Sequence, residues 1–206
     1  MLFRSVRRNL LCVTWSSARG HVFLLDLQAR VPTSSWTLPA PPAGYSDAAG
    51  VAMDDHFHLY VADPRNHCVR HFSPFGRHLA DIGHGPQEEG EVARDRLGTL
   101  WRPHAVAILA EDVLISGGEL PLRRAVQRFS RTGQALGHLR SCGDSEAEFG
   151  APRGLWCDAE GILVADTLFG RVQRFRPDGR FVASIACGER SEEHTSELQS
   201  PCNLVC

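Results

Sequence analysis

The amino-acid sequence of 206 residues predicts an all-β fold built from repeated four-stranded antiparallel sheets. One pattern of short apolar runs occurs three times, and the third run of each copy ends at Phe72, Phe129 and Phe175. Gly, Pro, Asp and Asn separate four runs in each copy, which is typical of strands joined by tight turns. The spacing between the recurring Phe residues of successive copies is close to the repeat length of propeller blades, which is about 40 to 50 residues. We therefore expect a partial β-propeller of about three to four blades.

The N-terminal region, residues 1–47, is expected to form a basic arm and a degenerate partial blade. Apolar runs at 10–15 and 21–26 are candidate strands, whereas a third strand of this unit is not evident. Several Arg and Ser residues precede the first acidic residue, Asp26, and a mitochondrial presequence has the same composition. The region therefore has two interpretations, a propeller strand behind a basic arm or a targeting segment.

The propeller region is expected to cover residues 48–188. Its predicted blades comprise residues of about 48–83, 103–139 and 152–186. Each blade carries a turn glycine between its third and fourth strands, at Gly76, Gly133 and Gly179. Glycine supplies the positive backbone dihedral angle that such hairpin turns require.

Aspartates close the second strand of the first and third of these blades, at Asp63 and Asp166. A carboxylate there can accept hydrogen bonds from backbone amides of the following turn, so a role in shaping the turn is expected. The connection between His84 and Trp101 is longer than a blade junction requires. It is either a binding loop or a tolerated surface insertion, because insertions of this kind cost little. We expect Trp101 to anchor its far end.

The C-terminal segment, residues 189–206, leaves the repeat pattern. From Arg190 onward it has no apolar period and resembles the translation of a sequencing-library adapter. We interpret it as a non-native or disordered tail outside the fold. Three or four blades leave an open sheet edge, and further blades or a second copy of the chain are expected to cap it.

The repeat resembles the NHL family of propellers across residues 48–188. In the family pattern, a Gly-hydrophobic start is followed by Val-Ala-Asp and by Arg-Val-x-x-Phe. The best match reads Gly154, then Val164 to Asp166, then Arg171 to Phe175. At the position of Arg171 the other units have Cys68 and Ala125, which puts a shared ligand site in doubt. The resemblance implies a ring of about six blades.

In relatives of this repeat class, the propeller often serves as the substrate-recognition part of a ubiquitin ligase. This chain has no Cys-x-x-Cys motif and therefore no paired thiolates for a RING zinc site. Outside the tail its five cysteines are scattered, which fits a reducing compartment, so a cytoplasmic location is expected and a mitochondrial one is the alternative. No apolar run is long enough to cross a membrane.

Candidate partner-binding residues gather in loops that emerge on one face of a propeller. These loops join the second strand of a blade to its third strand, and the same face carries the segments that lead into each blade. The residues are Arg65, His67, Arg102, His104, Arg123, Arg124, Arg153, Phe169 and Arg171. Guanidinium groups beside an aromatic ring can bind acidic peptides, phosphates or single-stranded RNA. The opposing interpretation is a solvated rim, whose charges acidic residues of the same loops offset.

A protein partner is favoured over RNA because the chain is nearly neutral, with a formal net charge of −2 at pH 7. The expected function is thus a non-enzymatic protein-interaction module, with an RNA-binding propeller as the alternative. A second alternative is a metal-dependent enzyme, because the segment around His104 resembles a ligand segment of the amidating-lyase propellers. Ala49 and Arg153 occupy the equivalent positions and cannot ligate zinc, so no metal, cofactor or catalytic residue is expected.

Overall fold

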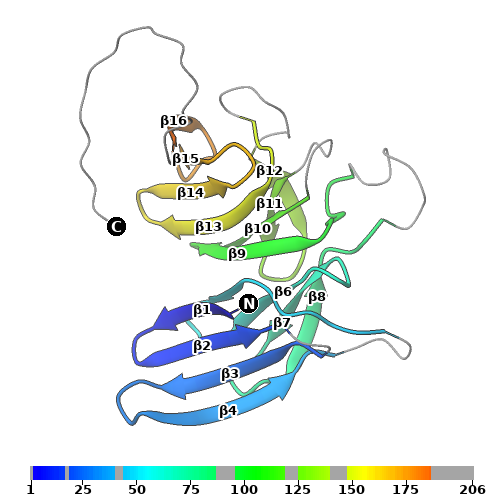
Figure 1. The fold of residues 1–206 in the computed structure, drawn as a ribbon, viewed down its shortest axis with the longest axis vertical. Coiled ribbons are helices and arrows are strands. Elements are labelled where there is room, and N and C mark those ends of the chain that lie inside the picture. Colours follow the sequence, from blue (N-terminus) through cyan, green and yellow to red (C-terminus); the bar gives the residue numbers. More distant parts are fainter. Residues whose placement is uncertain are drawn as a thin grey trace, which may run out of the picture.

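The computed structural model describes residues 2–16, 19–39, 44–86, 96–118, 125–139 and 148–186. These residues form four antiparallel sheets of four strands, and in each sheet the strands lie in sequence order (Figure 1). We call the sheets blades 1 to 4. Blade 1 comprises β1 (Leu2–Arg7), β2 (Leu10–Trp15), β3 (His21–Asp26) and β4 (Val31–Thr37). Blade 2 comprises β5 (Val51–Met53), β6 (Leu59–Asp63), β7 (Cys68–Phe72) and β8 (His78–Ile82).

The second half of the molecule repeats this arrangement. Blade 3 comprises β9 (Pro103–Leu109), β10 (Asp112–Gly117), β11 (Val126–Ser130) and β12 (Ala135–His138). Blade 4 comprises β13 (Pro152–Asp158), β14 (Gly161–Asp166), β15 (Arg171–Phe175) and β16 (Phe181–Ala186). The predicted all-β fold of four-stranded blades is therefore confirmed.

The N-terminal region differs from the expectation of an arm and a partial blade. Residues 2–7, which were expected to be an arm, form the first strand of a complete blade. The blade also has a fourth strand, β4, which the sequence analysis did not identify. The sequence pattern did not reveal β4, because most of its residues are exposed and several of these are polar, namely Thr33, Ser35 and Thr37. Blade 1 nevertheless hydrogen-bonds throughout, with Thr14 opposite Val22 and Val22 opposite Trp36.

The turn glycines adopt the conformation that the sequence predicts. Gly76, Gly133 and Gly179 have φ angles of 78°, 89° and 86°. In blades 2 to 4 the pairing of the third and fourth strands shifts register beside the recurring Phe, at Phe72, Phe129 and Phe175. The repeated Phe thus marks an irregularity of the sheet as well as a core position, since all three rings are buried.

Three hydrophobic cores join consecutive blades. The core between blades 1 and 2 includes Cys12, Val22 and Leu24 against Leu59 and Phe72. The two other cores follow the same plan. The core between blades 2 and 3 contains Tyr60, Ala62, Val69, Ile82, Val113, Ile115 and Phe129, and the core between blades 3 and 4 contains Leu114, Val126, Ile162, Val164 and Phe175. Burial of these apolar faces holds the blades to one another.

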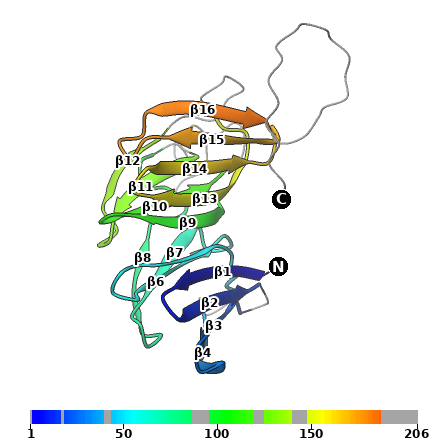
Figure 2. The same cartoon turned by 90° about the vertical axis from the view of Figure 1, so that its left-hand side faces the viewer.

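The blades form an open arc. The innermost strands β1, β5, β9 and β13 follow one another, and blades 1 and 4 lie at opposite ends of the molecule (Figures 1 and 2). A cavity of about 300 Å³ lies along these four strands and is lined by residues of each of them. Within the described residues no helix is long and apolar enough to cross a membrane.

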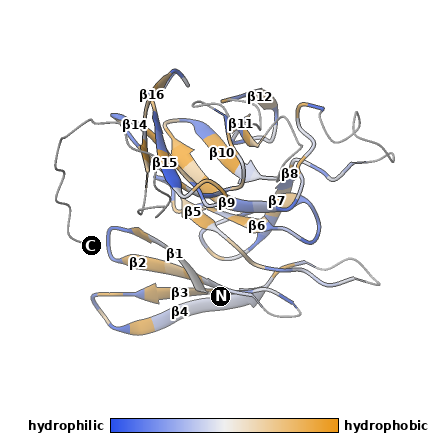
Figure 3. Cartoon of the chain, turned by 45° about the horizontal axis from the view of Figure 1, so that its top comes forward, coloured by the Kyte–Doolittle hydropathy of each residue, from blue (hydrophilic) through white to orange (hydrophobic). Residues whose placement is uncertain are grey.

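The two end blades bury one face each and expose the other. In blade 4, Ile162 and Val164 are buried, whereas Trp156 and Ile185 on the opposite face are 55% and 60% exposed. Blade 1 shows the same alternation, and its exposed face includes Trp15, which is 56% exposed. Figure 3 shows apolar residues along β2 and β3 as well as in the central blades. The outward faces of blades 1 and 4, at the two ends of the arc, are therefore apolar and exposed.

Candidate interaction surface

The described residues of the predicted site lie at one end of the blades, where the inner strands begin and the second strands end. We call this surface the loop face. It comprises Tyr45, Arg65, His67, Trp101, Arg102, His104, Arg153, Phe169 and Arg171. Tyr45 and Trp101 lie in the segments that lead into blades 2 and 3, and the sequence analysis did not include them in the site. The predicted site residues Arg123 and Arg124 lie outside the described residues.

Arg65 and Tyr45 form an exposed pair on the loop face. The Arg65 guanidinium lies 5.3 Å from the centre of the Tyr45 ring, and Tyr45 is 55% exposed. The next residue, Asn66, donates from its side-chain amide to the Tyr45 carbonyl oxygen at 3.1 Å. The loop between β6 and β7 therefore holds the segment before blade 2, so cation and ring are presented together.

His67 and Trp101 form a second pair, where blade 2 meets blade 3. Their rings stack with centroids 4.7 Å apart and planes 28° apart. The backbone amide of Arg102 donates to Nδ1 of His67 at 3.1 Å. Both His67 and Arg102 have positive φ angles, 55° and 46°. Trp101 thus anchors the far end of the connection that begins at His84, as the sequence predicts.

Arg153 and His104 connect the starts of blades 4 and 3. A guanidinium nitrogen, Nη1 of Arg153, lies 3.1 Å from Nε2 of His104. Because arginine only donates, Nε2 of His104 is the acceptor in this contact. Arg153 is exposed. The two residues that the sequence compared as metal-ligand positions therefore contact each other.

Arg171 serves mainly to hold its own blade. Its Nη2 donates to the Glu148 carbonyl oxygen at 2.6 Å, and its Nε lies 3.5 Å from Oδ2 of Asp166. The guanidinium also lies 4.9 Å from the centre of the Phe169 ring. The Arg171 side chain is 13% exposed. The charge of Arg171 is therefore committed to contacts within the chain.

The two strand-closing aspartates act on incoming segments as well as on turns. The Asp166 carboxylate accepts from the amides of Gly150 and Ala151, each at 2.9 Å. Asp63 accepts from the amide of Asp47 at 3.1 Å and from that of Asn66 at 3.3 Å. The expected turn contact is therefore present at Asp63. Each carboxylate also ties the segment that leads into its blade, which the sequence analysis did not foresee.

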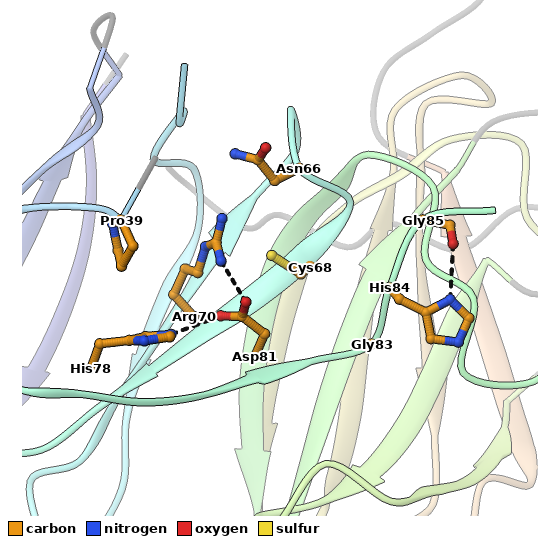
Figure 4. A pocket seen from close by; sticks show the side chains of 9 residues that line it. All are labelled: Pro39, Asn66, Cys68, Arg70, His78, Asp81, Gly83, His84 and Gly85. Atoms are coloured by element: carbon orange, nitrogen blue, oxygen red, sulfur yellow. Dashed lines mark hydrogen bonds and ion pairs between the residues drawn. The ribbon is translucent and has the colours of Figure 1, made fainter. Parts of the chain in front are cut away.

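A pocket of about 450 Å³ lies beside the loop face, between Pro39 and blade 2 (Figure 4). Arg70 extends into it from β7. Its Nη1 donates to Asp81 at 2.6 Å, and its Nε and Nη2 each lie 3.2 Å from Oδ2 of Asp63. Nε2 of His78 lies 2.7 Å from the other Asp81 oxygen. The sequence analysis did not predict this pocket, because its lining comes from segments far apart in the chain.

The cysteines of the described chain are poor nucleophiles. Burial raises the pKa of the Cys68 thiol in this pocket to about 12, and burial likewise raises the pKa of Cys157 to about 12. Both are therefore protonated thiols at neutral pH. Cys157 contacts the core between blades 3 and 4. Within the described residues, no three His, Cys, Asp or Glu side chains are arranged to hold a metal ion.

The arrangement of blades defines the class of this protein as a β-propeller, of which the described residues form four blades. No known protein family matches the sequence, and no curated protein is similar to it. Solved structures share the fold. A streptogramin B lyase is 11% identical with a TM-score of 0.63, and the similarity covers 91% of this chain and 54% of the lyase.

Two further solved structures share this fold. A protein of unknown function from Bacteroides caccae is 12% identical with a TM-score of 0.59, over 89% of this chain and 65% of that protein. The WD40 domain of Neurospora crassa Pan2 is 10% identical with a TM-score of 0.59, over 89% of this chain and 48% of the domain. This chain thus spans about half to two thirds of the length of these three proteins.

Proposed function

We propose that this protein is a non-enzymatic interaction module that binds a protein partner through its loop face. The observation that carries the proposal is the pairing of the exposed Arg65 guanidinium with the exposed ring of Tyr45. Aromatic residues and arginine are enriched at the energetic centres of protein interfaces. A guanidinium already held against a ring loses little side-chain entropy on binding.

The charge of the described loop face favours an acidic partner. Arg65, Arg102 and Arg153 are exposed there, whereas Asp63 and Asp166 are buried and occupied by contacts within the chain. Arginine forms bidentate hydrogen bonds with carboxylates. The proposed ligand is therefore an acidic peptide segment. The resemblance to NHL repeats supports a role as the recognition part of a larger assembly, such as a ubiquitin ligase, in the cytoplasm.

The test replaces three exposed arginines of the loop face, Arg65, Arg102 and Arg153, by Ala. A matched control replaces three exposed arginines of turns at the opposite end of the blades. These are Arg77, Arg176 and Arg180. The two triple variants have the same net charge, so they separate a specific face from general electrostatic attraction. Both are measured against an array of fluorescent acidic peptides.

We expect the loop-face variant to bind acidic peptides with an affinity lowered by about tenfold or more. A decrease of this size corresponds to the loss of a few charge-assisted hydrogen bonds. The control variant keeps the binding of the unmodified protein. Equal binding by the two variants would refute the loop face as the site. Binding to a single-stranded uridine oligonucleotide that weakens steeply with salt, without binding to peptides, would instead support the RNA-binding alternative.

A further inference from the structure

The outward face of blade 4 has the residue pattern of a covered face. In blade 2, the face toward blade 3 consists of Ala52, Tyr60, Ala62, Val69 and Ile82, all buried. The strand registers of blades 2 and 4 align these positions one by one with the outward face of blade 4. The equivalent residues are Trp156, Leu163, Ala165, Val172 and Ile185. All five are apolar, yet each is partly or largely exposed.

A glycine at the inner edge of this face points to the same conclusion. In blade 2, the Gly50 amide donates to the carbonyl oxygen of His104 in the next blade at 2.8 Å. A Cβ atom at Gly50 would lie 2.5 Å from that oxygen, so the close approach of blade 3 requires glycine there. The equivalent residue in blade 4 is Gly154, whose Cβ atom would meet only Ala165 of its own blade. Blade 4 therefore has the space for a following blade.

The charged residue on the same face is compatible with a covering blade. Arg174 lies beside Leu163 and forms an ion pair with Glu160 at 3.5 Å. Its equivalent in blade 3 is Arg128, which lies beside Leu114 in the interface with blade 4. There Arg128 pairs with Asp112 of its own blade and reaches the Pro177 carbonyl oxygen of the next blade at 3.4 Å. An arginine at this position thus already lies beneath a neighbouring blade.

The exposed face of blade 1 is the complementary surface. Two apolar pairs lie across β2 and β3 on it, Leu11 beside Leu25 and Val13 beside Phe23. Trp15 and Val6 on the same blade are each 56% exposed. The opposite face of blade 1 is occupied by blade 2 through Cys12, Val22 and Leu24. One chain therefore offers a face that requires a following blade and another that requires a preceding blade.

We propose that a second copy of the chain covers both faces, with blade 4 of each copy on blade 1 of the other. Two equivalent contacts related by a two-fold axis then close a ring of eight blades, within the range of about 4 to 8 that propellers adopt. Each new contact repeats the interface that already joins consecutive blades. The inference uses surfaces distinct from the loop face and does not depend on the proposed function.

The test measures mass in solution by sedimentation velocity over a range of micromolar concentrations. The unmodified chain is expected to sediment as a dimer. Trp156→Glu on blade 4 and Trp15→Glu on blade 1 each place a charge in the proposed contact, and each is expected to weaken association by about 30-fold or more. Phe75→Glu is the matched control, because Phe75 is 88% exposed in the turn between β7 and β8, away from both faces.

Mixing the two variants tests the head-to-tail arrangement. Each variant retains one intact face of opposite kind, so an equimolar mixture is expected to form a heterodimer through one contact while each variant alone stays monomeric. Dimers of Trp15→Glu alone would indicate contacts between two blades 4 and would overturn the proposal. A monomer of the unmodified chain at every concentration would also overturn it, and so would open-ended filaments. Circular dichroism of each variant checks that the blades remain folded.

Discussion

Blades 2 and 4 present the same surface pattern in two different environments. Their five aligned positions are apolar in both blades, but in blade 2 they are buried by blade 3 and in blade 4 they face outward. The sixth aligned position differs, with His71 in blade 2 and the exposed Arg174 in blade 4. The difference teaches that the repeat encodes a face suited to a neighbour, whereas burial itself depends on the neighbour being present.

The largest expected contrast concerns the strand-closing aspartates. In Asp63→Ala, the guanidinium of Arg70, which is 7% exposed, loses its contacts with Asp63. Leaving a buried charge poorly paired costs about 3 to 5 kcal/mol of the free energy of unfolding. In Asp166→Ala, Arg171 keeps its hydrogen bond to the Glu148 carbonyl oxygen, so the main loss is the pair of amide contacts, about 1 to 3 kcal/mol.

Urea unfolding of the two aspartate variants measures this contrast. The slope with denaturant should be the same for both, because each variant exposes the same surface on unfolding. Equal losses of stability would show that Arg70 is no more dependent on its aspartate than Arg171, and the comparison of the two blades would fail at this site.

The next contrast replaces one aligned isoleucine in each blade. Ile82 is fully buried between blades 2 and 3, and Ile82→Ala is expected to cost about 2 to 5 kcal/mol because it leaves a cavity. Ile185 is 60% exposed, so Ile185→Ala is expected to change monomer stability by no more than about 0.5 kcal/mol. Thermal unfolding of dilute protein compares them. A large loss at Ile185 would mean that blade 4 is covered even in the monomer.

The smallest expected effect is a pH dependence that belongs to blade 2. Burial lowers the pKa of His71, and the neighbouring His58, whose Nδ1 lies 3.0 Å from Nε2 of His71, acts in the same direction. The unfolded chain therefore binds a proton at higher pH than the folded one. Stability from His71 is present above about pH 6.5 and is lost as pH falls through the lowered pKa.

Melting temperatures at pH 7.5 and at pH 5.5 test this sign. The unmodified protein should be less stable at the lower pH, and His71→Gln should reduce the difference. Arg174→His, measured like the others in dilute monomeric protein, provides the matched control, because it places a histidine at the aligned but exposed position of blade 4, where no burial lowers its pKa. A control that increased the pH dependence as much as His71 does would contradict the assigned role of burial.

The sequence predicted the blades whose turns and apolar runs are regular, and it missed features that depend on tertiary contacts. Blades 2 to 4 and their turn glycines follow from local patterns. The first strand of blade 1 was interpreted as a basic arm because Arg4 and Arg7 dominate its composition, while its pairing with β2 is visible only in the sheet. β4 was missed because an outer strand with one exposed face needs few apolar residues.

For the candidate site, the sequence predicted which end of the blades carries the arginines, because strand direction determines where each loop emerges. It did not predict which arginines remain available. Arg171 and Arg65 are both arginines that follow the second strand of a blade, yet Arg171 is held by Glu148 and Asp166 whereas Arg65 is exposed over Tyr45. That distinction depends on carbonyl groups and rings brought in from distant segments. A pocket lined by Pro39, Asn66 and His84 is hidden for the same reason.

The strict sequence order of strands within each blade has a consequence for how the chain folds. Every hydrogen-bonded strand pair joins segments that are neighbours along the chain, so each blade can form before the following one is synthesised. Contacts of this short range favour rapid folding. The growing chain can therefore add one blade at a time onto the last, and the newest blade always presents the surface that receives its successor.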